Sequence, residues 1–298
     1  MHLPVYSASQ SYLLRNDIRR VKLVRSRNHV TGAAMPYADV SPSRTLRPTE
    51  AWCAYFQVNA ASCPAIPWEQ GVRLTPQEQA AIAASVQGFQ LGESSEGRHL
   101  LRCAEAYAER TGDRAYVTAI RLFIGEEQRH ARDLGRFLRL AGIPLLTRTW
   151  PDTVFRWLRH RAGLELSIGV LLTAEIIAKV YYLALRQATG DAVLRRLCDK
   201  ILDDEVAHVC FQSERLAQLR RERPRWLLAA THGGHRFFFA GTCVVVWWKH
   251  RRALRAGGFG WGRFWRAAWR ELEAALVLMN PATYADYRYE SVDRVPLT

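Results

Sequence analysis

Apolar residues recur every three or four positions from about residue 76 to residue 223, which is the spacing of helices that bury one face. No alternating strand pattern competes in this region. Glycine and proline divide the pattern into four stretches. We therefore expect helices over about 76–111, 114–141, 153–189 and 191–223, the third with a break near Gly163.

Residues at the ends of these stretches support the same division. The run 75–78 (Thr-Pro-Gln-Glu) combines an N-cap threonine, a proline at the first helical position and a glutamate that closes a capping box. Asp113 and Asp191 are placed to cap the second and fourth helices, directly after very short turns at Gly112 and Gly190. Long helices paired by short turns predict an all-α fold built on an antiparallel four-helix bundle.

The regions on either side of the bundle have a different character. Residues 1–48 lack periodicity and are rich in Arg, Ser and Pro, so we expect an irregular arm, and residues 51–75 read as an ordered but loop-like segment. Two more helical stretches follow the bundle, at about 225–255 and 261–279. The predicted organisation is listed in chain order: an arm and loop segment over 1–75, the bundle over 76–223, and a helical extension packing on the bundle over 224–298.

The charge of the chain is concentrated in two flanks. The 298 residues carry a formal net charge of +14. Residues 1–48 contribute +6 and residues 220–270 contribute +11, whereas the residues between them are neutral. Basic flanks suit an anionic partner such as lipid headgroups, RNA or an acidic carrier protein, and a purely compositional bias is the competing explanation.

Composition narrows the class of protein further. A hydrophobic content of 49% excludes a disordered chain. The six cysteines form no CxxC pair, which excludes a zinc ribbon and fits a reducing, cytoplasmic compartment. The longest apolar run, residues 237–248, is shorter than the roughly 20 residues of a spanning helix. No membrane span is therefore predicted, and a peripheral membrane role stays open.

Two of the predicted helices carry the same motif. Glu127 and His130 on the second helix, and Glu205 and His208 on the fourth, each form Glu-x-x-His, whose ends face the same way on a helix. One such motif is weak evidence. The two motifs lie 78 residues apart, however, as expected of equivalent positions in a repeated pair of helices.

The first and third helices offer one glutamate each at the same level. Glu175 and Glu205 lie 15 residues from Gly190 on either side, and Glu96 lies 16 residues from Gly112. Since a helix rises about 1.5 Å per residue, these carboxylates and that of Glu127 are predicted to lie roughly 22–24 Å from the turns. Glu175 also interrupts an apolar stretch, which indicates a buried charge that must be paired or coordinated.

Four carboxylates and two imidazoles in one core would repel one another without cations. Two divalent metal ions resolve that repulsion, and mixed oxygen and imidazole ligands favour iron or manganese over zinc. Two Fe(II) ions would balance the four negative charges. We therefore expect two iron ions, with manganese as the alternative, on the ligand set Glu96, Glu127, His130, Glu175, Glu205 and His208.

This pattern resembles that of the ferritin-like di-iron carboxylate superfamily, in which Glu, Glu-x-x-His, Glu and Glu-x-x-His follow one another on four helices. The resemblance covers about residues 76–223. It implies that Glu127 and Glu205 bridge the metals and that Glu96 and Glu175 are terminal ligands. It also implies that the residues before the two motif glutamates, Glu126 and Asp204, accept a hydrogen bond from the second nitrogen of a ligand histidine.

Several alternatives remain open at this level. Glu93 lies one turn before Glu96 and competes with it as the ligand, and His99 is a further ligand, a supporting donor or a surface residue. Lys179 lies four residues after Glu175, so an ordinary helical ion pair competes with metal binding. The remaining possibility is a metal-free bundle whose carboxylates only hold one another.

The C-terminal extension contains an apolar stripe opposite a row of arginines. Such a stripe covers the bundle or lies on a membrane surface. Its members are Trp261, Phe264, Trp265, Trp269, Leu272 and Leu276.

A reduced di-iron centre reacts with O2, so the leading interpretation is an O2-dependent oxidoreductase of the oxygenase, hydroxylase or desaturase type. Its partners would be O2, a small or carrier-bound organic substrate and an external electron donor, and an enzymatic role favours a monomer or homodimer. Ile201 occupies the position where the resemblance to N-oxygenases would require a further histidine. The alternatives are a ferroxidase or iron-handling protein and a metal-stabilised binding module with basic flanks.

Overall fold

The computed structural model describes residues 45–62, 64–94, 97–147 and 163–284. All regular structure within these ranges is helical, and no strand occurs in them. The elements are α1 (Thr49–Ala61), η2 (Trp68–Gln70), α2 (Pro76–Glu93), α3 (Arg98–Thr111), α4 (Arg114–Leu140), α6 (Leu164–Gln187), α7 (Ala192–Leu219), α8 (Arg225–Ala256), α9 (Trp261–Leu278) and η3 (Pro281–Thr283).

Most predicted helices are confirmed, including their capping. Thr75 and Glu78 form the predicted capping box at the start of α2, and Asp113 and Asp191 cap α4 and α7 through their side chains. Gly112 ends α3 with φ +79°, in the left-handed conformation that glycine accepts without a steric cost. The part of the third predicted helix before Gly163, residues 153–162, lies outside the described residues.

The prediction of a single helix over 76–111 is wrong, because the helix is interrupted between α2 and α3. Glu93 is the last residue of α2, and Gly97 adopts φ +63° before α3 begins. A Cβ atom at Gly97 would lie 2.5 Å from Cδ1 of Ile124, and other residues rarely adopt this positive φ, so the bend favours glycine. Because of this break, the height of Glu93 and of the other α2 residues is not given by counting along one helix from Gly112.

The loop-like reading of residues 51–75 is also wrong in part, since α1 covers Thr49–Ala61. This helix has no side-chain cap at its start and packs alongside α4, and the rings of its buried residues Trp52 and Phe56, one turn apart, contact Phe211 of α7. The indole Nε1 of Trp52 donates a hydrogen bond of 2.9 Å to Glu214 of α7. Tertiary contacts rather than local signals therefore hold α1 in place.

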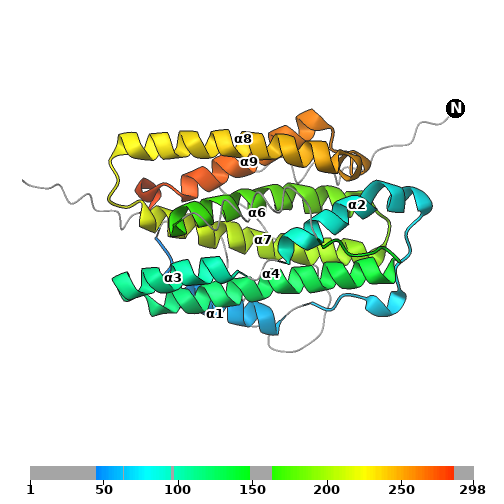
Figure 1. The fold of residues 1–298 in the computed structure, drawn as a ribbon, viewed down its shortest axis with the longest axis horizontal. Helices are drawn as coiled ribbons and strands as arrows, with labels where there is room; N and C mark the ends of the chain where they lie inside the picture. Colours follow the sequence, from blue (N-terminus) through cyan, green and yellow to red (C-terminus); the bar gives the residue numbers. More distant parts are fainter. Residues whose placement is uncertain (1–44, 63, 95–96, 148–162, 285–298) are drawn as a thin grey trace, which may run out of the picture. The chain divides into compact units, whose positions relative to one another are not determined.

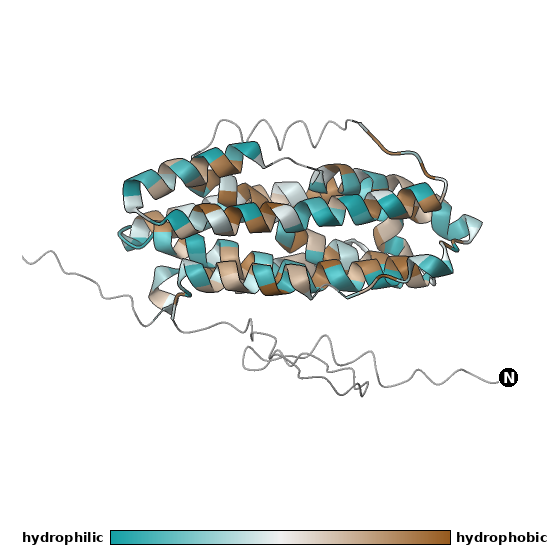
Figure 2. Cartoon of the chain, turned by 90° about the horizontal axis from the view of Figure 1, so that it is seen from below, coloured by the Kyte–Doolittle hydropathy of each residue, from teal (hydrophilic) through white to brown (hydrophobic). Residues whose placement is uncertain are grey.

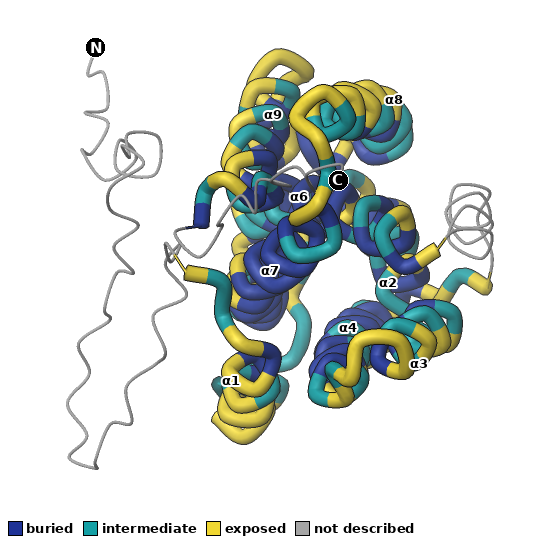
Figure 3. Tube along the Cα trace, turned by 90° about the vertical axis from the view of Figure 1, so that its left-hand side faces the viewer, coloured by how far each residue is buried: buried dark blue, intermediate teal, exposed yellow. Residues whose placement is uncertain are grey.

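Helices distant in sequence lie alongside one another (Figure 1). The helices α6 and α7 pack together across the Gly190 turn, and α2 and α3 pack on α4. In addition, α4 contacts α7, and α3 contacts α6. Apolar and polar residues share each helix surface (Figure 2), and the end view shows buried residues on the sides where α4, α6 and α7 face one another (Figure 3). The candidate site residues lie between these helices.

The two C-terminal helices pack on the others. The helix α8 contacts α2 and α6, and α9 contacts α6, α7 and α8. The apolar stripe predicted over 261–276 is turned inward in part, since Phe264, Leu272 and Leu276 are buried whereas Trp261 is exposed. By length and hydropathy, α6 is the single helix in the described ranges that could cross a membrane, but 72% of its most apolar window is buried inside the protein, as in a core helix.

Candidate metal centre

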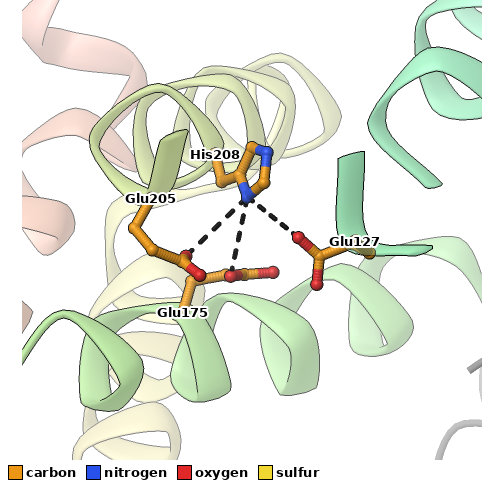
Figure 4. A group of neighbouring side chains, drawn as sticks. All are labelled: Glu127, Glu175, Glu205 and His208. Carbon is orange, nitrogen blue, oxygen red and sulfur yellow. Dashed lines mark ion pairs between the residues drawn. The ribbon is translucent and has the colours of Figure 1, made fainter. Parts of the chain in front are cut away.

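Four ligand-type side chains from α4, α6 and α7 converge on one point (Figure 4). Glu127, Glu175, Glu205 and His208 each offer one atom, and these four atoms all lie within 4.8 Å of one another. Nδ1 of His208 is 3.1 Å from Oε1 of Glu127. It is 3.7 Å from Oε2 of Glu205 and 3.8 Å from Oε2 of Glu175. We call this group the inner cluster.

A second group lies beside the first and shares Glu127 with it. Glu93 at the end of α2, Glu127 and His130 also place one ligand atom each within 4.8 Å of the others. Nδ1 of His130 is 3.7 Å from Oε1 of Glu127. We call this group the outer cluster. Because Glu127 belongs to both clusters, its carboxylate is positioned to bridge two cations.

The two histidines are held by a crossed pair of contacts. Nε2 of His130 on α4 lies 2.9 Å from Asp204 on α7, and Nε2 of His208 on α7 lies 3.0 Å from Glu126 on α4. Each acidic residue stands directly before a motif glutamate. With Nε2 engaged in this way, Nδ1 of each ring is left to face its cluster. Glu126 and Asp204 thus make the contacts expected of them, but each with the histidine of the other helix.

Further side chains fix the crossed pair. Nδ2 of Asn59 on α1 lies 2.5 Å from Glu126 and 2.8 Å from Asp204. The guanidinium of Arg129 lies 3.2 Å from both carboxylates, and Nζ of Lys200 donates to both oxygens of Asp204. Although burial opposes it, hydrogen bonding to His130 and nearby positive charge lower the pKa of Asp204 strongly. Asp204 is therefore a fixed negative charge behind the site.

Burial and mutual repulsion govern protonation in the inner cluster. Burial first, then the charges of Glu175 and Glu93, raise the pKa of Glu127 well above its usual value, and burial and Glu175 do the same for Glu205. Burial opposes ionisation of Glu175 too, but its contacts with Glu205 and His208 lower its pKa to about 2. Burial alone would lower the pKa of His208, but the surrounding carboxylates raise it well above its usual value. Without a cation, the cluster therefore holds protons in its place.

Unsatisfied polar atoms test whether a cation fits here. Both carboxylate oxygens of Glu205, Oε1 of Glu127 and Nδ1 of both His130 and His208 make no hydrogen bond within the described part of the chain, although several lie at ion-pair distance. Buried polar atoms in native proteins are normally satisfied. These five atoms all face the two clusters and are all good ligands for iron or manganese, so the residues fit a pair of divalent ions.

The structure brings together five of the six predicted ligands: Glu127, His130, Glu175, Glu205 and His208. The sixth, Glu96, lies outside the described residues, and Glu93, the alternative, is the residue of the first expected helix that reaches the site. His99 belongs to neither cluster; its Nε2 lies 3.4 Å from Sγ of Cys103. Lys179 forms its ion pair with Glu271 on α9, which removes the proposed Glu175–Lys179 pair.

Two supporting residues were missed in the sequence. Oη of Tyr182 donates a hydrogen bond of 2.8 Å to Glu93, and Nε2 of Gln212 donates one of 3.2 Å to Glu175. Gln212 lies one turn after His208 on the same face of α7, so helical spacing could have identified it. Asn59 carried no such signal, because it lies on α1, the helix that the sequence pattern did not reveal.

The chain matches no family model, no curated protein and no solved structure.

Proposed function

We propose that this protein is a ferritin-like bundle carrying a non-haem di-iron centre and acting as an O2-dependent oxidoreductase. The observation that carries the proposal is the sharing of Glu127 between two ligand clusters drawn from successive helices in the order Glu, Glu-x-x-His, Glu, Glu-x-x-His. The four helical positions of the bundle are taken by α2 with α3, α4, α6 and α7. That order is the one found in di-iron carboxylate bundles.

Each cluster would hold one ion. Glu93 and His130 serve the first, Glu175, Glu205 and His208 serve the second, and Glu127 is common to both. Four carboxylates neutralise two Fe(II) ions, which suits a buried site better than an uncompensated charge of either sign. Two ferrous ions bound here would supply the electrons that activate O2, and manganese would fill the same ligand set.

The protein's own groups set the geometry and the proton inventory of the site. Tyr182 donates a hydrogen bond to one oxygen of Glu93, and Gln212 donates one to one oxygen of Glu175. The other oxygen of each carboxylate is left for its cluster. The pKa of Glu205 is raised, so in the metal-free state its carboxyl oxygen keeps a proton that must leave when a cation binds. These contacts prepare the ligands before metal arrives.

The surroundings are dry on one side and more open on the other. The rings of Phe56 and Phe123 lie 6.2 Å and 4.7 Å from that of His208, which keeps water from the inner cluster. Glu93 and Glu127 are partly exposed, whereas Glu175 and Glu205 are buried. O2 and a small or carrier-bound organic substrate would therefore approach at the outer cluster, with electrons supplied by an external donor.

The test is anaerobic loading of the full chain with Fe(II), followed by removal of unbound metal, iron counting and exposure to air. We expect about two irons per chain and the near-ultraviolet absorption of an oxo-bridged ferric pair. Loading Glu109→Ala in parallel controls for surface binding, since Glu109 is an exposed glutamate of α3 outside both clusters. Failure of the wild-type protein to retain stoichiometric iron or manganese would overturn the proposal.

The same preparation separates an oxidoreductase from an iron-handling protein. An oxidoreductase is expected to stop after oxidising its bound pair and to resume O2 consumption when a reductant is added. Continued oxidation of a large excess of Fe(II), with growth of a mineral core, would instead assign the site to iron handling.

A further inference from the structure

The outer face of α8 exposes four large apolar side chains along one side of the helix. Phe237 is 85% exposed, Trp226 is 72% exposed and Trp248 is 62% exposed. Val244, which is also exposed, lies between Phe237 and Trp248. Their spacings of 11, 7 and 4 residues place all four on one side of the helix. At about 1.5 Å per residue the row from Trp226 to Trp248 is roughly 33 Å long. We call it the α8 stripe.

The stripe is not the face by which α8 holds to the rest of the protein. The opposite face buries Phe239, Cys243 and Leu254 and packs on α2, α6 and α9. Figure 3 shows the outer side of α8 as exposed. Because α8 is apolar on both faces, its outer face exposes apolar side chains to water in the monomer. Exposed apolar patches on a protein surface normally mark an interaction site.

The charged residues of α8 and of the first turns of α9 are all basic. Residues 225–270 contain nine Lys and Arg side chains and no Asp or Glu. Arg251, Arg252 and Arg255 are exposed and follow the stripe on the last turns of α8, and the guanidinium of Arg251 lies over the ring of Trp248. The acidic residues nearest in sequence on α9, Glu271 and Glu273, are paired with Lys179 and Arg236.

This combination selects between the candidate occupants. A second copy of the chain would bring one basic face against another, with no acidic residue on α8 to compensate. A bilayer that contains anionic lipid offers acyl chains to the aromatic row and phosphates to the arginines beside it. Tryptophan and arginine at one level are typical of helices that lie in the interface between headgroups and acyl chains.

We infer that the α8 stripe binds the surface of an anionic lipid bilayer, with α8 lying in the plane of the membrane and α9 and α6 behind it. The inference does not depend on the metal centre, because α8 contributes no residue to either cluster. It identifies the membrane contact with α8 rather than with the apolar stripe of α9, half of whose residues are buried.

The test is cosedimentation of the full-length protein with phosphatidylcholine vesicles and with vesicles of phosphatidylcholine containing phosphatidylglycerol. We expect binding to the anionic vesicles at least about tenfold tighter than to the neutral ones, weakening as salt is added. The double variant Phe237→Ser/Trp248→Ser is expected to lose at least about tenfold in affinity. The control Val58→Ser/Leu140→Ser removes two half-exposed apolar side chains from α1 and α4 and should stay within about twofold of the wild type.

A charge pair of variants completes the test. Arg252→Gln/Arg255→Gln should weaken binding to anionic vesicles, whereas Arg132→Gln/Arg139→Gln, two exposed arginines of α4, should not. Undiminished vesicle binding by the stripe variant would overturn the inference and transfer the contact to another basic part of the chain. Absence of wild-type binding, together with a dimer that the stripe substitutions dissociate, would assign the face to a second copy.

Discussion

The candidate metal centre and the α8 stripe both depart from the usual distribution of polar residues outside and apolar residues inside, one by burying polar groups and the other by exposing apolar ones. At the centre, carboxylates and imidazoles lie where apolar side chains are expected, and Glu205 has no exposed surface. Along the stripe, aromatic rings lie where charged side chains are expected, and Phe237 is almost fully exposed. Each arrangement is costly for the isolated chain. The comparison supports our proposals that the first site binds cations and that the second binds lipid.

The largest effect is expected from the residue that both clusters share. Glu127→Ala should reduce bound iron from about two ions per chain to about none, because it removes a ligand from each position at once. Glu175→Ala should leave about one ion, since Glu175 belongs to the inner cluster alone. Metal analysis and far-ultraviolet circular dichroism check both variants. Two irons retained by Glu127→Ala would show that the carboxylate does not bridge.

A finer substitution separates the two candidates for the first ligand. Glu93→Gln should lose about one iron, because Glu93 lies in the outer cluster, while Glu96→Gln should keep both. The two variants change the same functional group three residues apart, so each is the control for the other. The opposite result would return the ligand role to Glu96.

The contrast between Glu93 and Glu96 shows how far the sequence could reach. Glu127, Glu175 and Glu205 could be aligned by counting from Gly112 and Gly190, because α4, α6 and α7 run unbroken between turn and site. Counting does not extend to the remaining helical position, where the bend at Gly97 separates α2 from α3 and Glu96 lies outside the described residues. Gly97 permits a bend at this point, but the closeness of Ile124, which disfavours a larger residue there, is a tertiary feature that the local sequence does not contain.

The supporting groups were predictable only where they share a helix with the motif. Glu126 and Asp204 precede the motif glutamates, so their role as histidine partners could be predicted. That each contacts the histidine of the other helix depends on how α4 packs against α7. Asn59 joins both carboxylates from α1, a helix held by Trp52 and Phe56 rather than by capping. Long-range packing of this kind leaves no local pattern in a single sequence.

Two phenylalanines on α8 provide a direct comparison of inside and outside. Phe239→Ala should destabilise the protein by about 3–5 kcal/mol, because the side chain is fully buried and its removal leaves a cavity. Phe237→Ala, two residues away and 85% exposed, should change stability by less than about 0.5 kcal/mol and should weaken vesicle binding instead. Denaturant unfolding measures the first effect and vesicle cosedimentation the second. A large loss of stability in Phe237→Ala would show that the stripe is covered in solution.

The smallest effect concerns the inner face that fixes α8 in place. Nδ1 of His250 lies 2.8 Å from the hydroxyl of Ser85, and burial first, then Lys249, lower the pKa of His250 to about 3. An unfolded histidine titrates near 6.5, so between these values only the unfolded state binds the proton. As the pH falls below about 6.5, the free energy of unfolding should therefore decrease by about 1.4 kcal/mol per pH unit through this residue.

His250→Asn isolates that contribution, because the other titrating groups remain in both proteins and cancel in the difference. The variant should be less stable than the wild type at pH 7, and the gap between them should narrow steadily as the pH falls toward 5. Urea unfolding at several pH values measures it. A gap that stays constant with pH would mean that His250 takes up a proton within the folded protein. The inner face of α8 would then be more hydrated than its packing against α2 and α6 indicates.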